Sequence, residues 1–127
     1  MAATVLIVDD SAEVRHVVRT FLERDPSFRV CGEASRGPEA VIKAEELRPD
    51  IVLLDLLMPQ LNGIETAAVL KNRVPQSRIV LFSNYTDDIG RTLPSTVGID
   101  LVVAKGSLTD LMQSLKTLIS RKPIAAG

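Results

Sequence analysis

The sequence predicts an α/β protein whose core is a doubly wound parallel sheet of five strands, with helices on both faces. Five short apolar segments alternate with segments whose apolar residues recur at helical spacing. Strands joined by helical crossovers form parallel sheets, and right-handed crossovers place the carboxyl ends of all strands at one edge. With 127 residues the chain fits one domain with its own core.

The expected strands are rich in β-branched residues and leucine, which favour extended structure. Thr4–Val8 and Ile51–Leu54 are the most apolar, as is typical of strands that are buried on both faces. The five expected strands are Val5–Val8, Phe28–Cys31, Ile51–Leu54, Ile79–Phe82 and Leu101–Ala104.

Four segments between or after these strands carry apolar residues at helical spacing and have capping residues or proline at their ends. We expect helices from Ser11 or Asp10 to just before Pro26, and over Pro38–Arg48, Gly63–Val74 and Leu108–Ile119. The last has the clearest apolar stripe, which we interpret as core rather than as a groove for a partner. In the third helix, Ala67 and Ala68 are expected to face inward.

A further helix is expected somewhere in Thr86–Val97, but Gly90 and Pro94 interrupt it. Both residues disfavour a continuous helix, so a short, bent or mobile segment is predicted there.

Composition and charge make several classes of protein unexpected. The formal net charge of −1 gives no reason to expect binding to nucleic acid or anionic membranes, and no apolar run is long enough to span a bilayer. Cys31 is the only cysteine, which rules out an intrachain disulfide and favours a reducing, cytoplasmic location. We interpret Cys31 as a small apolar strand residue and His16 as an exposed one. Residues 1–122 are expected to form the domain and 123–127 a disordered tail, with no output domain.

Polar side chains follow four of the five expected strands. They are Asp9 and Asp10, Asp55, Ser83 and Lys105. These residues should meet at one edge of the sheet, where open α/β sheets bind their ligands. Three adjacent carboxylates repel one another unless a cation lies between them, and Mg²⁺ accepts carboxylates, waters and a phosphate oxygen. The pattern therefore indicates phosphoryl transfer to a carboxylate, with Lys105 and Ser83 contacting the phosphoryl oxygens.

The acid pair Asp9–Asp10, Asp55 with Gly63 after it, Ser83 and Lys105 together resemble the receiver domain of response regulators, over about Thr4–Ser120. The resemblance implies a flavodoxin-like fold with strand order 2-1-3-4-5. It also implies that Asp55 is phosphorylated by a histidine kinase or a histidine phosphotransfer protein. Such a domain is not an enzyme beyond its own phosphorylation and dephosphorylation.

The resemblance further implies that Mg²⁺ is held by Asp10 and Asp55, with Asp9 assisting and the backbone carbonyl of Leu57 as a further ligand. In the family, the residue at the Ser83 position moves toward the phosphate. The movement rearranges the surface of the fourth helix, fifth strand and fifth helix, which would signal to a downstream protein. Dimerisation on phosphorylation remains open.

Three departures from the family pattern affect these expectations. Val102 lies where the family usually has an aromatic switch residue, so a rotamer exchange of Tyr or Phe cannot carry the signal. Gly106 follows Lys105 where proline is frequent. Leu57 and Tyr85 lie two residues after Asp55 and Ser83, where many relatives have polar groups.

The sequence also allows other interpretations of these residues. Asp10 could cap the first helix, Ser83 could begin a turn, and Lys105 could be a solvated surface charge. Val102 motivates a receiver-like docking module that acts without phosphorylation. An aspartyl-nucleophile phosphatase is a weaker alternative, because Leu57 stands where such enzymes need a second acid.

Overall fold

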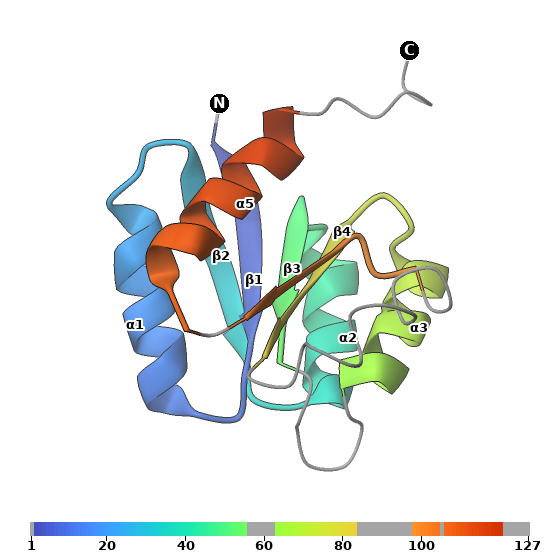
Figure 1. Cartoon of the computed structure of the whole chain (residues 1–127). Coiled ribbons are helices and arrows are strands. Elements are labelled where there is room, and N and C mark those ends of the chain that lie inside the picture. The colour runs from blue at the N-terminus through green and yellow to red at the C-terminus, as the bar shows by residue number, and fades with distance from the viewer. Residues whose placement is uncertain (1, 56–62, 84–97, 105, 121–127) are drawn as a thin grey trace.

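The computed structural model describes residues 2–55, 63–83, 98–104 and 106–120, and of Ser83 it describes the backbone. Its five strands form one parallel sheet in the order β2-β1-β3-β4-β5, which confirms the predicted fold class and strand order (Figure 1). The elements are β1 (Ala3–Val8), α1 (Ala12–Glu23), β2 (Phe28–Ala34), α2 (Gly37–Leu47), β3 (Ile51–Leu54), α3 (Gly63–Arg73), β4 (Arg78–Ser83), β5 (Leu101–Ala104) and α5 (Leu108–Ser120).

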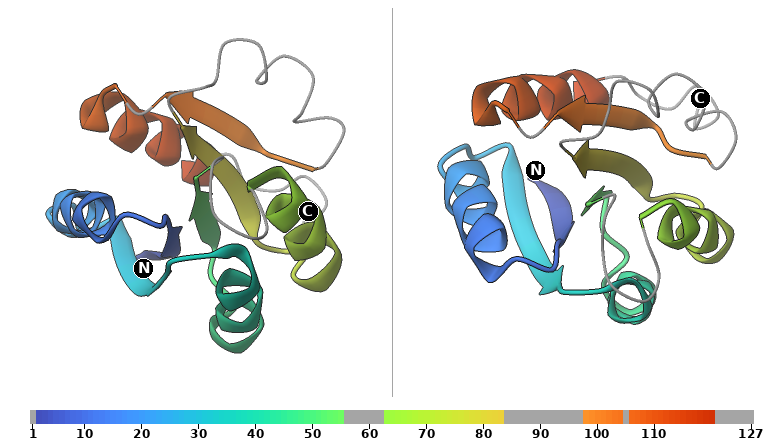
Figure 2. Two further views of the ribbon diagram at one scale, coloured as in Figure 1. Left: turned by 90° about the horizontal axis from the view of Figure 1, so that it is seen from below. Right: turned by 60° about the horizontal axis from the view of Figure 1, so that its bottom comes forward.

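The helices cover both faces of the sheet. Helices α1 and α5 lie on one face and α2 and α3 on the other, as the views from below also show (Figures 1 and 2). Side chains of β1 alternate between these layers: Val5 and Ile7 pack toward α1 and α5, whereas Leu6 and Val8 pack toward α2 and α3. This alternation explains why the central strands read as continuous apolar segments, since both of their faces are buried.

Most of the expected elements agree with the structure to within one or two residues. The stripe of α5 is core, as predicted, because Leu111, Leu115 and Leu118 are all buried. The expectation for α3 is wrong at one position: Ala68 is exposed, and Thr66 is buried in its place. The expected helix within Thr86–Val97 and the expected tail lie outside the described residues.

Two single residues agree with their expected environments. Cys31 is half-buried in β2, and burial raises the pKa of its thiol, which suits a packing residue rather than a reactive one. His16 is exposed on α1. Among the described residues, no helix is long and apolar enough to cross a bilayer.

Candidate functional site

The pairing of β1 with β3 brings Asp9 and Asp55 to the same edge of the sheet. Val8 is aligned with Leu54, so the next residue on each strand is an aspartate. The hydrogen-bond ladder continues past the strand ends: Asp55 N–H donates to the carbonyl of Val8 (2.9 Å), and Asp9 N–H donates to that of Ala34 (3.0 Å). Asp9 and Asp55 are only 3% and 7% exposed.

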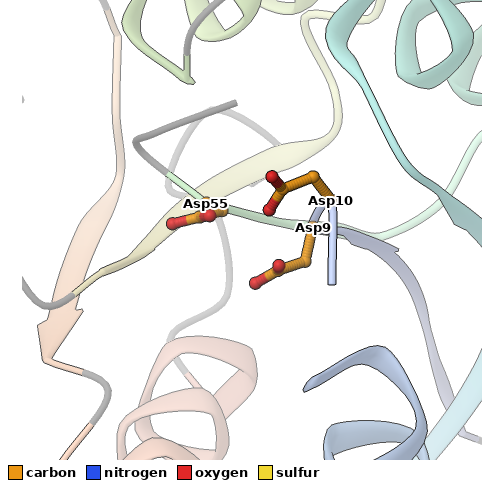
Figure 3. A group of neighbouring side chains, drawn as sticks. All are labelled: Asp9, Asp10 and Asp55. Carbon is orange, nitrogen blue, oxygen red and sulfur yellow. The ribbon is translucent and has the colours of Figure 1, made fainter. Parts of the chain in front are cut away.

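Asp9, Asp10 and Asp55 form one cluster of carboxylates, as predicted. One oxygen from each lies within 4.8 Å of the others, and Figure 3 shows all three side chains extending toward the same region. Asp10 is exposed whereas Asp9 and Asp55 are buried, so the cluster opens to solvent on one side. An ion there could therefore keep water or a phosphate oxygen as a ligand.

The donor set of this cluster fits Mg²⁺. Octahedral Mg²⁺ has oxygen ligands at about 2.1 Å, so opposite ligands are about 4.2 Å apart, close to the span of the cluster. Carboxylate oxygens are the ligands that this hard cation prefers, and a positive ion would relieve the repulsion among three acids.

The first turn of α1 decides between two interpretations of Asp10. Ser11 is the N-cap of the helix, and its hydroxyl accepts a hydrogen bond from Val14 N–H (3.2 Å). The capping position is thus taken by the next residue, and Asp10 is not needed for it. Ser11 also donates its own N–H to Asp9 Oδ1 (2.9 Å), which holds one oxygen of that carboxylate.

The remaining predicted site residues are only partly within the described structure. Ser83 is the last residue of β4, paired with Ala104 of β5, so its backbone lies at the edge where the aspartates are. The side chain of Ser83, all of Lys105 and all of Leu57 lie outside the described part, and their roles stay predictions. Val102 is half-buried and packs against the core on the α2 and α3 face.

An ion-pair network beside the carboxylates was not found from the sequence. Arg15 donates through Nη1 to the backbone carbonyl of Asp9 (2.6 Å) and through Nε to Glu33 Oε1 (3.0 Å). Glu33 also accepts from Arg19, and its backbone carbonyl accepts from Lys43. Burial alone would raise the pKa of Glu33, but the hydrogen bonds from Arg19 and Arg15 hold that pKa below its ordinary value.

This network joins α1, β2 and α2 at the carboxyl edge of the sheet. Its only signal in the sequence is a charged residue, Glu33, following the apolar part of β2, together with the i,i+4 pair Arg15 and Arg19. Neither signal predicts a contact with Asp9, because that contact depends on how the helix packs.

Comparison with known proteins gives one family for this chain. The model of the response regulator receiver domain matches residues 5–116. The chain is also similar to the response regulator protein VraR of Staphylococcus epidermidis, with 34% identity over 119 residues, 91% of this chain and 56% of the relative. It thus spans about half the length of the curated relatives it matches.

Solved structures give the same result. The response regulator domain of Thermotoga maritima CheB has a TM-score of 0.88 at 28% identity, covering 97% of this chain and 100% of the other. The isolated REC domain of RcsB from Salmonella enterica serovar Typhimurium, determined with the phosphomimetic BeF₃⁻, has a TM-score of 0.84 at 26% identity. That match covers 98% of this chain and 93% of the RcsB chain.

Proposed function

The chain belongs to the response regulator receiver domain family of two-component signalling, and we propose that it accepts a phosphoryl group on Asp55 in a Mg²⁺-dependent reaction. The donor is a phosphohistidine of a histidine kinase or of a histidine phosphotransfer protein. The observation that carries the proposal is the cluster of Asp9, Asp10 and Asp55, whose oxygens lie within 4.8 Å of one another. The RcsB relative, determined with a phosphate mimic, supports the same chemistry.

In the proposed reaction a carboxylate oxygen of Asp55 attacks the phosphorus. The new O–P bond forms as the N–P bond to the donor histidine breaks, and the electron pair of that bond stays on the imidazole. Asp55 is only 7% exposed, so few water molecules contact it before the attack. Lys105 and the hydroxyl of Ser83 contact the phosphoryl oxygens.

The ion-binding residues are Asp10 and Asp55, with Asp9 assisting and the Leu57 carbonyl as a further ligand. When bound, Mg²⁺ neutralises negative charge on the phosphoryl oxygens. Asp9 contributes a carboxylate that is fixed from one side by Ser11 N–H, so it needs little reorganisation to face the ion.

We further propose that Ser83 and Val102 link phosphorylation to a protein partner through the surface of the fourth helix, β5 and α5. A hollow of about 490 Å³ at the surface of β5 and α5 is lined by Val102, Asp110 and Gln113 among others. The formal net charge of −1 gives no reason to expect nucleic acid as that partner.

A second candidate is a receiver-like docking module that acts without phosphorylation, and Val102 is the observation that favours it. Valine has no aromatic ring to move between an inward and an outward position, and it is already half-buried. The phosphatase alternative has no such support, because the family is one of regulators.

Incubation with Mg²⁺ and a small-molecule phosphodonor such as acetyl phosphate, followed by intact mass spectrometry, separates the two candidates. The proposal predicts the addition of one phosphoryl group that requires Mg²⁺ and is lost in Asp55→Asn. A chain that stays unmodified under these conditions, while folded by circular dichroism, would favour the docking module.

A further inference from the structure

We propose that Arg15 is a positioning residue for the divalent ion, because it fixes the peptide unit between Asp9 and Asp10. The inference rests on the proposed ion site and adds to it a residue that touches neither the ion nor the phosphoryl group. Arg15 acts through the backbone of Asp9, on which the direction of the Asp10 side chain depends.

Asp9 makes hydrogen bonds through its amide, its carboxylate and its carbonyl, and Arg15 is the partner of the carbonyl. The amide of Asp9 donates to Ala34 in β2, and its carboxylate accepts from Ser11 N–H. The carbonyl of Asp9 accepts from Arg15 Nη1 at 2.6 Å. Each of these three groups therefore has a hydrogen-bond partner. Arg15 contacts the carbonyl, which belongs to the peptide unit that leads to Asp10.

Fixing the Asp9 carbonyl also fixes the start of Asp10. A peptide unit is planar, so the Asp9 carbonyl, the Asp10 N–H and the Asp10 Cα move together. A rotation of this plane would swing the exposed carboxylate of Asp10 away from Asp55. In Figure 3 the Asp10 side chain extends from the end of β1 toward Asp55, which is the orientation that the Arg15 contact preserves.

Glu33 holds Arg15 in place. Its Oε1 accepts from Arg15 Nε at 3.0 Å, and its other oxygen accepts from Arg19. The Arg15 side chain is only 18% exposed, so it is packed as well as paired. The planar guanidinium donates in two directions at once, which a lysine ammonium on a flexible stem does not reproduce.

Charge and position predict opposite results when Arg15 is replaced. A cation near a divalent-ion site repels the ion, so removing only the charge should tighten ion binding. Loss of positioning should weaken binding, because Asp10 is then free to turn away. The sign of the change therefore separates the two roles.

The test is a Mn²⁺ titration followed by electron paramagnetic resonance of the free ion, with Mn²⁺ as the probe for the site. We expect Arg15→Met to weaken Mn²⁺ binding by about tenfold or more, the range found when groups that orient metal ligands are removed. Arg15→Lys should weaken it by less. The matched control is Arg19→Met, which removes the same charge from α1 and also takes an arginine partner from Glu33, but leaves the hydrogen bond from Arg15 to the Asp9 carbonyl in place. Its affinity should equal that of the wild type or be slightly higher.

A second readout distinguishes positioning from general damage. The Mg²⁺ concentration for half-maximal phosphorylation should rise in Arg15→Met, whereas the rate at saturating Mg²⁺ should stay near that of the wild type. An Arg15→Met protein with unchanged or tighter Mn²⁺ binding would overturn the inference but leave the proposed function standing. If Arg15→Met does not fold, wild-type affinity in Arg15→Lys would overturn it instead. A wild-type chain that binds no Mn²⁺ would overturn both.

Discussion

Asp9 and Asp55 are acids in a place where an ionised group is costly to bury. Both follow apolar strands that are buried on both faces, and both are almost fully covered. Transfer of a carboxylate out of water is tolerated only where hydrogen bonds or cations compensate for it. For Asp9 part of that compensation is visible in the Ser11 N–H at 2.9 Å from Oδ1.

Leu57 gives a prediction that belongs to a single side chain. It lies two residues after Asp55, where an apolar group should hinder the placement of the water that hydrolyses the phosphorylated aspartate. We expect Leu57→Asn to shorten the lifetime of phosphorylated Asp55 by roughly tenfold, which corresponds to about 1.4 kcal/mol in the barrier. Intact mass spectrometry after removal of the donor measures the decay, with Ile42→Asn, an exposed position on α2, as the control. A decay in Leu57→Asn as slow as in the wild type would contradict the prediction.

At the scale of an element, α1 serves both the fold and the site. Its apolar side packs against the sheet through Val18 and Leu22, whereas Arg15 reaches back to Asp9. The N-cap Ser11 directly follows Asp10, so the way the helix starts decides where the acid pair points.

The N-cap of α1 should therefore be separable from the proposed ion site. Ser11→Ala removes the hydroxyl that accepts from Val14 N–H but keeps the Ser11 N–H that donates to Asp9. We expect the free energy of unfolding in urea to fall by about 1 kcal/mol, and Mn²⁺ affinity to stay unchanged. Ser11→Gly is the matched variant, with a loss of only about a few tenths of a kcal/mol. A large drop in Mn²⁺ affinity in Ser11→Ala would show that the hydroxyl, and not the backbone, supports the site.

The elements also show what could be read from the sequence. Strands such as Ile51–Leu54 were predicted to the residue, because central strands are apolar on both faces and polar groups mark their ends. The strand β2 was predicted to end at Cys31 but continues to Ala34. The charged residue Glu33 lies in this continuation, and a charged residue does not suggest a strand. Glu33 is tolerated there because β2 is an edge strand and Glu33 forms an ion pair with Arg15 of α1.

The carboxylate cluster follows from the order of the strands, whereas the contacts around it do not. Asp9, Asp10 and Asp55 were predicted together because topology alone brings the ends of parallel strands to one edge. The contact of Arg15 with Asp9 joins residues whose meeting depends on the packing of α1, and no local pattern encodes it. The sequence also placed Ala68 in the core, where the structure has Thr66. Alanine and threonine are both small, so they do not show clearly which face of a helix is buried.

At the scale of the whole molecule, Asp25 ties the turn after α1 to α5. Asp25 Oδ2 is 2.6 Å from Lys116 Nζ, and this hydrogen bond, with a second from Ser27 N–H, lowers the pKa of Asp25 to about 2. A carboxyl whose folded pKa is depressed stabilises the fold above its unfolded pKa, and this contribution is lost as the pH falls through the folded value.

We expect the stability difference between wild type and Asp25→Asn to be constant above about pH 5 and to shrink progressively as the pH falls through the folded pKa of about 2. Urea denaturation at several pH values between 2 and 7 measures this difference. Lys116→Met should remove most of the same pH-dependent part, because Lys116 is the main cause of the lowered pKa. A difference that persists unchanged at pH 2 would contradict the assignment of the effect to this pair.

When no divalent ion is present, repulsion among the three carboxylates should lower the free energy of unfolding of the whole molecule. Their oxygens lie within 4.8 Å of one another, so like charges repel in a partly buried setting. We therefore expect Asp10→Asn to raise the free energy of unfolding by about 1 kcal/mol in the presence of a chelator. Excess Mg²⁺ should stabilise the wild type, by about 2.7 kcal/mol at 100 times the dissociation constant, because the ion binds only the folded chain.

Asp10→Asn should lose most of this stabilisation by Mg²⁺, so the order of the two proteins reverses when the ion is added. Urea denaturation with chelator and with Mg²⁺ measures both effects, and Glu46→Gln, an exposed acid on α2, controls for a general change in charge. If Asp10→Asn were less stable than the wild type in chelator, the acid pair would be contributing to the fold, and repulsion would not be its main effect. The reversal ties stability to function, because the same charges that oppose folding are those that the ion requires.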